Sequence, residues 1–203
     1  MNLIRNIYLR ICERIFSVGK AEYEKKVNLR IRENSTVKSS TVFYSGSSLN
    51  NFSNDKSRIT LGENCHIYGA LTVLPFGGKI TFGDNCSFGE FSRITSTKGI
   101  YIGSRVMIAH NVNILDNNSH PTDDKLRHED FINSYNGHMK EYDLKAKEIV
   151  IEDDVWIGFN SIILKGVHIG KSAIIGAGSI VTKDVPEYSV VAGNPLRAIH
   201  NSN

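Results

Sequence analysis

Residues 151–185 read IEDDVWIGFNSIILKGVHIGKSAIIGAGSIVTKDV, and in this stretch an aliphatic residue returns at every sixth position. These positions are Ile151, Ile157, Ile163, Ile169, Ile175 and Val181, and a small or β-branched residue follows each of them four places later. A period of six matches neither the 3.6-residue repeat of an α-helix nor the two-residue alternation of a half-buried strand. Each hexad is therefore expected to form a short strand and a turn, with its leading aliphatic side chain pointing inward.

The same repeat appears upstream in three shorter blocks. Their leading residues are Leu61, Ile67, Val73, Phe82, Phe88, Ile94, Ile102, Ile108 and Ile114. Three hexads make one triangular coil, and stacked coils give an all-β solenoid, a β-helix, in which each coil contacts only its neighbours. Cys65 and Cys86 fall at the small fifth position of a hexad, so we interpret them as core residues and not as metal ligands.

Residues 1–32 precede the repeat and carry a net charge of +5, whereas the whole chain carries +3. Apolar residues recur at helical spacing in this segment, at Ile4, Tyr8, Ile11 and Ile15. The pattern predicts an amphipathic helix. The favoured role is a helix packed on the end of the solenoid or on a neighbouring subunit. The alternative is a peripheral membrane contact through residues 1–32, since arginines lie among the apolar residues.

A polar segment with three histidines interrupts the repeat between two well-registered blocks. Long excursions from a rigid scaffold are usually functional, so a site or lid is expected there. The chain is thus divided into an N-terminal helical segment, residues 1–34, and a β-helix domain, residues 35–200, with a long loop at 116–148.

Composition narrows the class of protein. A chain with this modest net charge does not resemble a nucleic-acid-binding protein. No apolar run is long enough to span a bilayer, and charges interrupt the apolar start, which argues against a signal peptide. The expected location is the cytoplasm. The three cysteines form no CxxC pair and predict no disulfide framework.

Four segments carry a resemblance to a known family: residues 116–121 (DNNSHP), 151–158, 175–184 and 191–197 (VAGNPLR). Together they resemble hexapeptide-repeat acetyltransferases, above all galactoside, maltose and nodulation-factor acetyltransferases and the O-acetyltransferases of bacterial capsule and lipopolysaccharide. The resemblance covers about residues 60–200. It implies a left-handed parallel β-helix, a homotrimer and acetyl-CoA as co-substrate, with no metal. The left hand comes from the family alone, because the general preference is for right-handed crossovers.

The resemblance assigns the general base to His120, which aligns with the catalytic histidine of the family. A neutral imidazole can accept a hydroxyl proton near physiological pH. A carboxylate commonly holds the second nitrogen of such a base. Asp116 is the first candidate for that role, and Asp123 and Asp124 are the alternatives.

The resemblance also places acetyl-CoA between adjacent subunits. Trp156 would line the active-site tunnel, and the backbone N–H of Gly158 or Phe159 would face the thioester carbonyl as oxyanion donor. The Ala177 amide would meet the pantetheine arm. The basic and hydroxyl groups expected at the phosphate end are Thr182, Lys183 and Arg197.

The acceptor side departs from the family pattern. Galactoside-type members carry an Asn and an Asp in the coil before the catalytic loop, and residues 88–93 (FGEFSR) contain no such pair. Glu90 and Arg93 are therefore expected to contact a larger or charged sugar, with exposed turn residues as the alternative interpretation, and His110 is expected to border the site.

Four functions remain open from the sequence. The first is O-acetylation of a sugar in a bacterial surface polysaccharide, and the second is acetylation of a small molecule, such as a free sugar, an amino-sugar nitrogen or an antibiotic. The third is a zinc carbonic anhydrase on the same scaffold, which would need converging histidines. The fourth is a non-catalytic β-helix, which the presence of His120 argues against.

Overall fold

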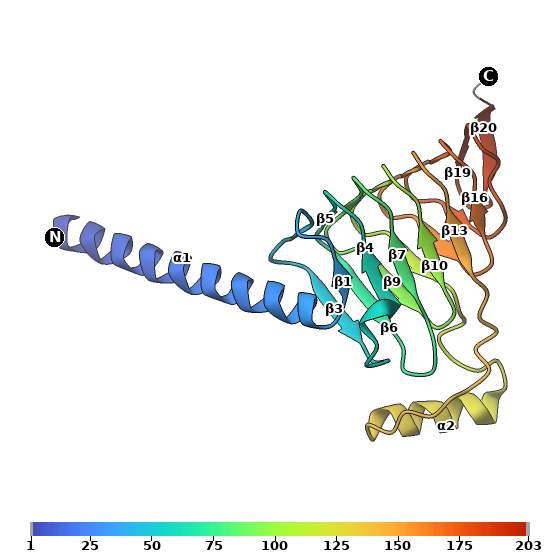
Figure 1. Ribbon diagram of the computed structural model, residues 1–203, viewed down its shortest axis with the longest axis horizontal. Helices are drawn as coiled ribbons and strands as arrows, with labels where there is room; N and C mark the ends of the chain where they lie inside the picture. Colours follow the sequence, from blue (N-terminus) through green and yellow to red (C-terminus); the bar gives the residue numbers. More distant parts are fainter. Residues whose placement is uncertain (1, 202–203) are drawn as a thin grey trace.

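The computed structural model describes residues 2–201 of the chain, and it consists of a solenoid with one helix at its N-terminal end and another at its side (Figure 1). Residue 1 and the side chain of Ile4, which belong to the predicted helix, lie outside the part that can be described. Helix α1 spans Asn2–Glu33 and helix α2 spans Asp124–Tyr135. A short 3-10 helix, Lys56–Arg58, lies between two of the first strands.

Three sheets form the sides of the solenoid. The first sheet contains β1 (Thr36–Val37), β4 (Ile59–Leu61), β7 (Ile80–Phe82), β10 (Ile100–Ile102), β13 (Ile149–Ile151) and β16 (His168–Ile169). The second contains β2 (Val42–Phe43), β5 (His66–Ile67), β8 (Ser87–Phe88), β11 (Met107–Ile108), β14 (Trp156–Ile157), β17 (Ile174–Ile175), β19 (Ser189–Ala192) and β20 (Arg197–Asn201). The third contains β3 (Ser48–Asn51), β6 (Ala70–Val73), β9 (Arg93–Ser96), β12 (Asn113–Leu115), β15 (Ile162–Leu164) and β18 (Ile180–Val181).

The strands pair in parallel from coil to coil, apart from the antiparallel pair β19–β20 at the C-terminal end. Equivalent hexad positions lie directly above one another; for example, Ile100 pairs with Ile80 on one side and with Ile149 on the other. The leading aliphatic residues are buried, and each contributes roughly 1.5–3 kcal/mol by leaving water. The predicted β-helix and its inward positions are thus confirmed.

Cys65 and Cys86 lie inside the solenoid, as predicted, in adjacent coils. Their thiols donate to the backbone oxygens of Gly83 and Gly103. Its hydrogen bond to the Cys65 side chain and its burial both raise the pKa of the Cys86 thiol. These contacts agree with the interpretation of Cys65 and Cys86 as small core residues.

Three corners join the sheets in each coil. The first corner connects the first sheet to the second, the second corner connects the second sheet to the third, and the third corner leads to the next coil. Many corners contain a non-glycine residue with positive φ, a conformation that asparagine adopts more readily than most residues. Examples are Asn64 and Asn85 at the first corner and Asn111 and Asn160 at the second.

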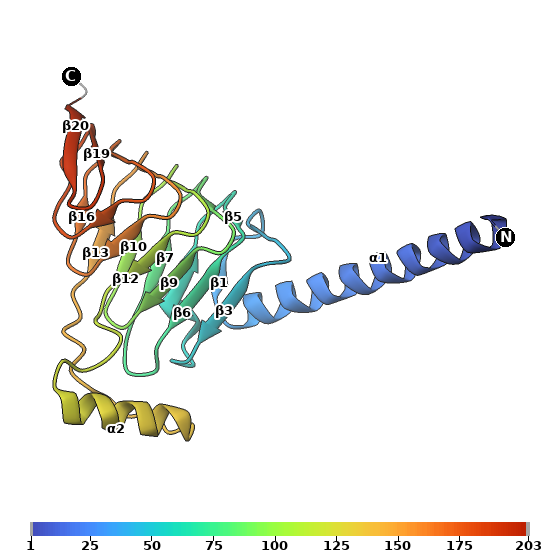
Figure 2. The ribbon, with the colours of Figure 1, turned by 180° about the vertical axis from the view of Figure 1, so that it is seen from behind.

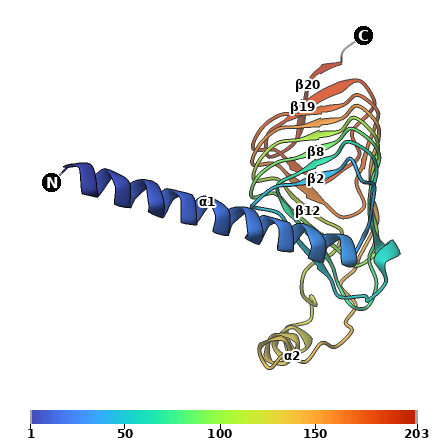
Figure 3. The ribbon, with the colours of Figure 1, turned by 60° about the vertical axis from the view of Figure 1, so that its left-hand side comes forward.

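Helix α1 covers the N-terminal end of the solenoid only with its last turns. Ile31 is buried there, Val27 packs beside it, and the Arg32 guanidinium donates to the backbone oxygen of Thr41 at 2.6 Å. The rest of the helix extends away from the first coil in each view (Figures 1, 2 and 3). The expectation of a helix packed on the solenoid therefore holds only for its C-terminal part. Among the described helices, none combines the length and the hydropathy that a bilayer span requires.

Candidate active site

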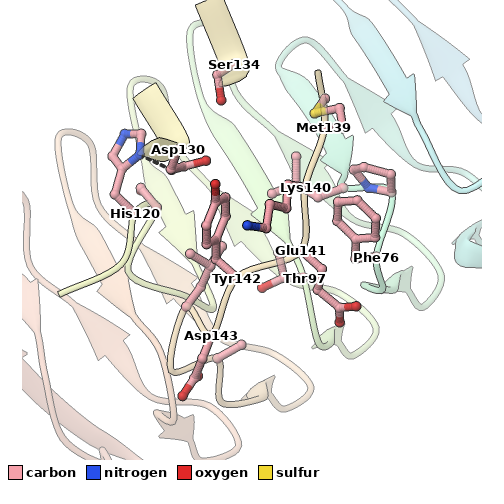
Figure 4. Close-up of a pocket in the computed structure, with 15 residues that line it drawn as sticks. Phe76, Thr97, His120, Asp130, Ser134, Met139, Lys140, Glu141, Tyr142 and Asp143 are labelled. Carbon is pink, nitrogen blue, oxygen red and sulfur yellow. Dashed lines mark hydrogen bonds and ion pairs between the residues drawn. The ribbon is translucent and has the colours of Figure 1, made fainter. Parts of the chain in front are cut away.

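The side chain of His120 is held by an acidic residue of helix α2. Its Nδ1 lies 2.7 Å from Asp130 Oδ2 (Figure 4). The His120 side chain is 55% exposed, while Asp130 is 14% exposed, so the carboxylate backs a ring that faces solvent. No residue among 2–201 forms a hydrogen bond with Nε2 of His120. The ring therefore has one anchored nitrogen and one nitrogen that is open to a ligand.

The excursion between β12 and β13 contains helix α2, which positions Asp130. Asp123 caps this helix, since its Oδ1 accepts from the backbone N–H groups of Lys125 and Leu126. The backbone N–H of Asn118 donates to the oxygen of Leu144, which joins the two ends of the excursion. The segment is thus a folded element with its own helix, and Asp123 serves as its cap without contacting His120.

Asp116 has a different role from the predicted one. Its buried carboxylate accepts hydrogen bonds from Ser96 Oγ and from the backbone N–H groups of the third corner below, at Thr97, Lys98 and Gly99. Its backbone oxygen accepts from Lys147 N. The expectation that Asp116 orients His120 is therefore corrected. Asp116 connects the start of the excursion to the neighbouring coil, and Asp130 is the residue hydrogen-bonded to the histidine.

A pocket of about 760 Å³ lies between the excursion and the third corner of the earlier coils. His120 and Asp130 line one side, and Tyr142, Lys140 and Phe76 lie around the cavity with them (Figure 4). The remaining lining residues are Leu74, Pro75, Thr97, Ser119, Ser134, Met139, Glu141, Asp143, Leu144 and Ala146. His120 and Asp130 thus lie together at the edge of a space that can take a small organic group.

The second corner carries the predicted backbone donors. The N–H of Gly158 donates to the oxygen of Ile175 at 2.8 Å, so it belongs to the ladder between coils. The N–H groups of Phe159 and Ala177 have no acceptor within residues 2–201. Of the two predicted oxyanion donors, only Phe159 is therefore available, and Gly158 is withdrawn from that role.

Gly158 has a steric role at this corner. A Cβ on this residue would lie 2.6 Å from the nitrogen of Ala177 and 2.9 Å from the oxygen of Ile175. Such a carbon would clash with the backbone of the next coil. The glycine thus lets the two coils stack closely beside the free N–H groups of Phe159 and Ala177.

His110 and Glu90 continue the same corner toward the N-terminal coils. The His110 ring stacks on Phe159, with centroids 5.2 Å apart and planes 9° from parallel. Asn111 N donates to the oxygen of Glu90, and Asn160 N donates to the oxygen of His110. Glu90 and Arg93 line a second pocket of about 510 Å³. His110, Glu90 and Phe159 thus lie on one continuous surface.

The other predicted residues divide between the two corners. Trp156 is half exposed on the outer face of the second sheet, beside Met107 of the neighbouring strand. Arg197 begins β20, next to Ala192 at the edge of the same sheet. Thr182 and Lys183 follow β18 and are exposed at the third corner.

One chain therefore does not bring all the predicted site residues together. His120 belongs to the excursion at the third corner, whereas Phe159 and Ala177 lie at the second corner. Asp130 and Tyr142 were not predicted. Asp130 lies in the polar segment that forms helix Asp124–Tyr135, and this position is the one sequence feature that could have pointed to it.

The residues described in the structure contain no group of three His, Cys, Asp or Glu side chains that could hold a metal ion. His66 instead pairs with the Tyr44 hydroxyl, and His168 pairs with Glu152. The converging histidines that a zinc carbonic anhydrase would need are therefore not found in this part of the chain.

Comparison with known proteins gives matches over the solenoid. The family model described as bacterial transferase hexapeptide (six repeats) matches residues 148–183. A galactoside O-acetyltransferase of Lactococcus lactis subsp. lactis is 38% identical over 147 residues, which are 70% of this chain and 64% of that protein. The chain thus spans slightly less than two thirds of that relative's length.

One further relative and one solved structure are also similar to this chain. A putative lipopolysaccharide biosynthesis O-acetyl transferase of Escherichia coli K12, WbbJ, is 34% identical over 151 residues, or 74% of each chain. The solved N-acyltransferase AntD from Bacillus cereus, in complex with dTDP and 3-hydroxybutyryl-CoA, has a TM-score of 0.65 at 18% identity and covers 88% of both chains. That structural likeness concerns the fold alone, the left-handed parallel β-helix. On its coil repeat and on these matches, the chain belongs to the hexapeptide-repeat family of bacterial transferases.

Proposed function

We propose that this chain transfers the acetyl group of acetyl-CoA to a hydroxyl group of a sugar in a bacterial surface polysaccharide, capsule or lipopolysaccharide, with His120 as general base. The observation that carries the proposal is the contact between His120 Nδ1 and Asp130 Oδ2 at 2.7 Å. Because the carboxylate accepts the Nδ1 proton, the lone pair of the neutral ring lies on Nε2, which forms no hydrogen bond with the described residues.

The proposed reaction uses few groups. The acceptor hydroxyl gives its proton to Nε2 of His120 while its oxygen attacks the thioester carbonyl, and the proton then passes to the leaving thiolate of coenzyme A. The free N–H of Phe159 stabilises the negative charge that develops on the carbonyl oxygen. A backbone donor in a rigid coil needs no reorganisation for this task.

The second corner is proposed to hold acetyl-CoA. The N–H groups of Phe159 and Ala177 at this corner have no acceptor among the described residues, which supports a role for the corner in ligand binding. The pantetheine arm has amide groups that can accept from Ala177 N–H. Arg197 at the neighbouring strand edge is proposed for the phosphate end, because guanidinium groups complement phosphate charge.

A homotrimer is proposed because the site is incomplete in one subunit. His120, Thr182 and Lys183 belong to the third corner, and Phe159 and Ala177 belong to the second. A threefold ring sets the third corner of one subunit beside the second corner of the next, which would create three identical sites. The exposed apolar pair Met107 and Trp156 on the second sheet is the kind of surface that such an interface covers.

A polysaccharide acceptor is supported by the breadth of the second corner and by one relative. Glu90 and Arg93 line the pocket of about 510 Å³, which offers both charges to an acceptor longer than one sugar. The name of the 34% identical relative includes lipopolysaccharide biosynthesis. Acetylation of a small free sugar is the second candidate, because the 38% identical relative is named for galactosides.

The proposed location is the cytoplasm, at the inner face of the membrane, where acetyl-CoA is made and surface glycans are assembled. The basic N-terminal segment, residues 1–32, supports a peripheral contact there.

The test is an assay of free thiol released from acetyl-CoA in the presence of purified capsule or lipopolysaccharide fragments, free sugars and amino sugars. The proposal expects release with a polysaccharide fragment, an ester in the product, and a loss of about 10²–10⁴-fold for His120→Ala. Equal release by the variant would refute the role of the base. Release with free sugars alone would favour the second candidate, and amide formation would refute transfer to a hydroxyl.

A further inference from the structure

Most of helix α1 has no partner in the chain. Of its described side chains, those before Glu24 are all exposed, and the apolar ones include Phe16 at 75%, Ile15 at 67% and Tyr8 at 66%. The helix projects from the first coil in each of three views (Figures 1, 2 and 3). A helix exposed in this way draws little stability from propensity alone, so an apolar partner is expected to cover it.

The apolar side chains between residues 7 and 18 form one broad face. With 3.6 residues per turn, Ile7, Ile11, Ile15 and Val18 form one side of this face. Further apolar side chains widen the face on one flank, at Tyr8, Cys12, Leu9 and Phe16. This face is wider than the narrow seam of a coiled coil, in which only two positions of each heptad are apolar.

Charged and polar side chains occupy the opposite face. Arg10, Glu13 and Ser17 lie there, and Arg14 and Lys20 lie at its two edges. Three cations against one anion give this part of the helix a positive surface. A broad apolar face with cations beside it is typical of helices that lie in the interface of an anionic membrane.

The part of helix α1 that follows Val18 argues against a continuous contact between α1 helices of two subunits. The apolar spacing of Tyr8, Ile11, Ile15 and Val18 would place the next seam positions at Glu22 and Lys25. Both positions carry charge, so a seam between α1 helices of several subunits would stop after about three turns. The breadth of the face and its cationic rim favour a lipid surface over a second copy of the chain.

We propose that residues 7–18 of helix α1 dock in the plane of an anionic phospholipid surface. The apolar face enters the boundary between head groups and acyl chains, and Arg14 and Lys20 at its two edges contact lipid phosphates. Arg10, on the opposite face, adds to the positive charge near the surface. The C-terminal turns keep the solenoid attached, because Ile31 is buried and Arg32 donates to Thr41 O.

The docking has a consequence for the site. The pocket beside His120 is lined by Leu74, Pro75 and Phe76, which belong to the connection between β6 and β7 in the N-terminal half of the solenoid. Helix α1 leaves the solenoid from this same end (Figure 1). The docking would thus hold the pocket near a membrane surface, where a glycan carried on a lipid is presented. This consequence rests on the proposed function, whereas the docking itself does not.

The experiment is co-sedimentation of the full-length protein with vesicles of phosphatidylcholine, with and without phosphatidylglycerol. The wild type is expected to bind the anionic vesicles and to be released by high salt. Ile11→Gln/Ile15→Gln should lower binding at least about tenfold, because two apolar side chains of this face are lost. Arg10→Gln/Arg14→Gln should lower it at least about tenfold on anionic vesicles only.

The matched control is Lys25→Gln/Arg30→Gln, which removes the same charge from the same helix outside residues 7–18. Binding by this control within about twofold of wild type supports the proposal, and an equal loss in both charge variants refutes it. Absence of vesicle binding by the wild type also refutes it. A further refuting result is a change of oligomeric mass for Ile11→Gln/Ile15→Gln in lipid-free solution, which would assign the face to helix–helix contact.

Two measurements separate this proposal from the proposed function. His120→Ala should bind vesicles as the wild type does, because it leaves the helix intact. Ile11→Gln/Ile15→Gln should retain thiol release with a water-soluble acceptor fragment. Vesicle binding without acetyl transfer would refute the function alone, and acetyl transfer without vesicle binding would refute the docking alone.

Discussion

His120 and Asp130 form a hydrogen-bonded pair across ten residues of sequence, with His120 Nδ1 at 2.7 Å from Asp130 Oδ2. His120 lies before helix α2, and Asp130 lies within it. The helix is therefore the element that orients the imidazole. The pair differs from the other histidine–carboxylate pair, His168 with Glu152, because only His120 lines a pocket of about 760 Å³.

Asp130→Asn is expected to lower kcat while the KM for acetyl-CoA stays near the wild-type value. The amide can present a donor to Nδ1 and so favour the wrong tautomer, but the loss should stay below the roughly 10²–10⁴-fold that a general base supplies. Steady-state kinetics of thiol release provide the measurement. Asp130→Glu should recover part of the rate.

The control for this prediction is Glu129→Gln on the same helix. Glu129 pairs with Lys140 at 2.6 Å, and this hydrogen bond, followed by the charge of Lys140, lowers the pKa of Glu129. Glu129 does not line the pocket. If Glu129→Gln reduced kcat as much as Asp130→Asn, the effect would reflect the helix and not the contact with His120.

Asp116→Ala is expected to destabilise the fold by about 3 kcal/mol or more, because each buried donor left without an acceptor costs roughly 1–3 kcal/mol. The donors are Ser96 Oγ and the N–H groups of Thr97, Lys98 and Gly99. Urea unfolding followed by circular dichroism gives the free energy. The exposed Asp124→Ala should change it by less than about 1 kcal/mol. Equal effects would contradict the buried role of Asp116.

Gly158→Ala is expected to raise the KM for acetyl-CoA and to lower the rate, since its Cβ would lie 2.6 Å from Ala177 N. Gly137→Asn is a suitable control, because Gly137 has a φ of +73° and open space around it. Its asparagine tolerates that backbone conformation. Unchanged kinetics in folded Gly158→Ala would remove this corner from the acetyl-CoA site.

A shared site predicts complementation between two impaired variants, measured at an acetyl-CoA concentration at which each alone has little activity. When His120→Ala and Gly158→Ala are unfolded together and refolded at equal amounts, about one quarter of the sites in a threefold ring combine intact corners from both. Thiol release should therefore return to about a quarter of the wild-type rate. Mixing the folded variants without unfolding is the control. No recovery in a mixed trimer would mean that each subunit works alone.

Acidic pH should weaken the contact between Glu152 and His168, which lie in neighbouring coils. The hydrogen bond from His168, and then the backbone N–H of Lys171, lower the pKa of Glu152 from its ordinary value of 4.5. A carboxylate with a lowered pKa in the folded state stabilises the fold at higher pH, and this stabilisation is lost as the pH falls below 4.5 through the folded-state pKa.

The measurement is the thermal unfolding midpoint against pH for wild type, Glu152→Gln and Glu63→Gln. The wild type should exceed Glu152→Gln at neutral pH, and the two curves should converge in acid. Glu63→Gln should follow the wild type, because the Glu63 carboxylate forms no hydrogen bond within residues 2–201. Parallel curves for wild type and Glu152→Gln would contradict the linkage.

Much of the scaffold followed from local pattern. A period of six places Ile151, Ile157 and Ile163 on three sheets of one coil, and the structure buries all three. The same register placed Cys65 and Cys86 inside, where the structure has them. Such predictions succeed because each coil repeats the same contacts with its neighbours, so a short stretch carries the information for its own packing.

The contacts of the site depended on tertiary structure. Asp116 is adjacent to the excursion in sequence, yet its carboxylate accepts hydrogen bonds from the backbone of the corner one coil below. No local sequence pattern reveals this contact. Asp130 became the partner of His120 only because helix α2 folds back over the excursion. Gly158 and Phe159 are neighbours with the same kind of donor, and only the ladder to Ile175 distinguishes them.

The sequence by itself determined the coil, its inward residues and the family, because these depend on a six-residue repeat that is the same in every coil. Only the tertiary structure decided which carboxylate holds His120, which amide is free and where helix α1 points. Those outcomes depend on contacts between residues that are distant in the chain, and each such contact competes with others for the same donor or acceptor.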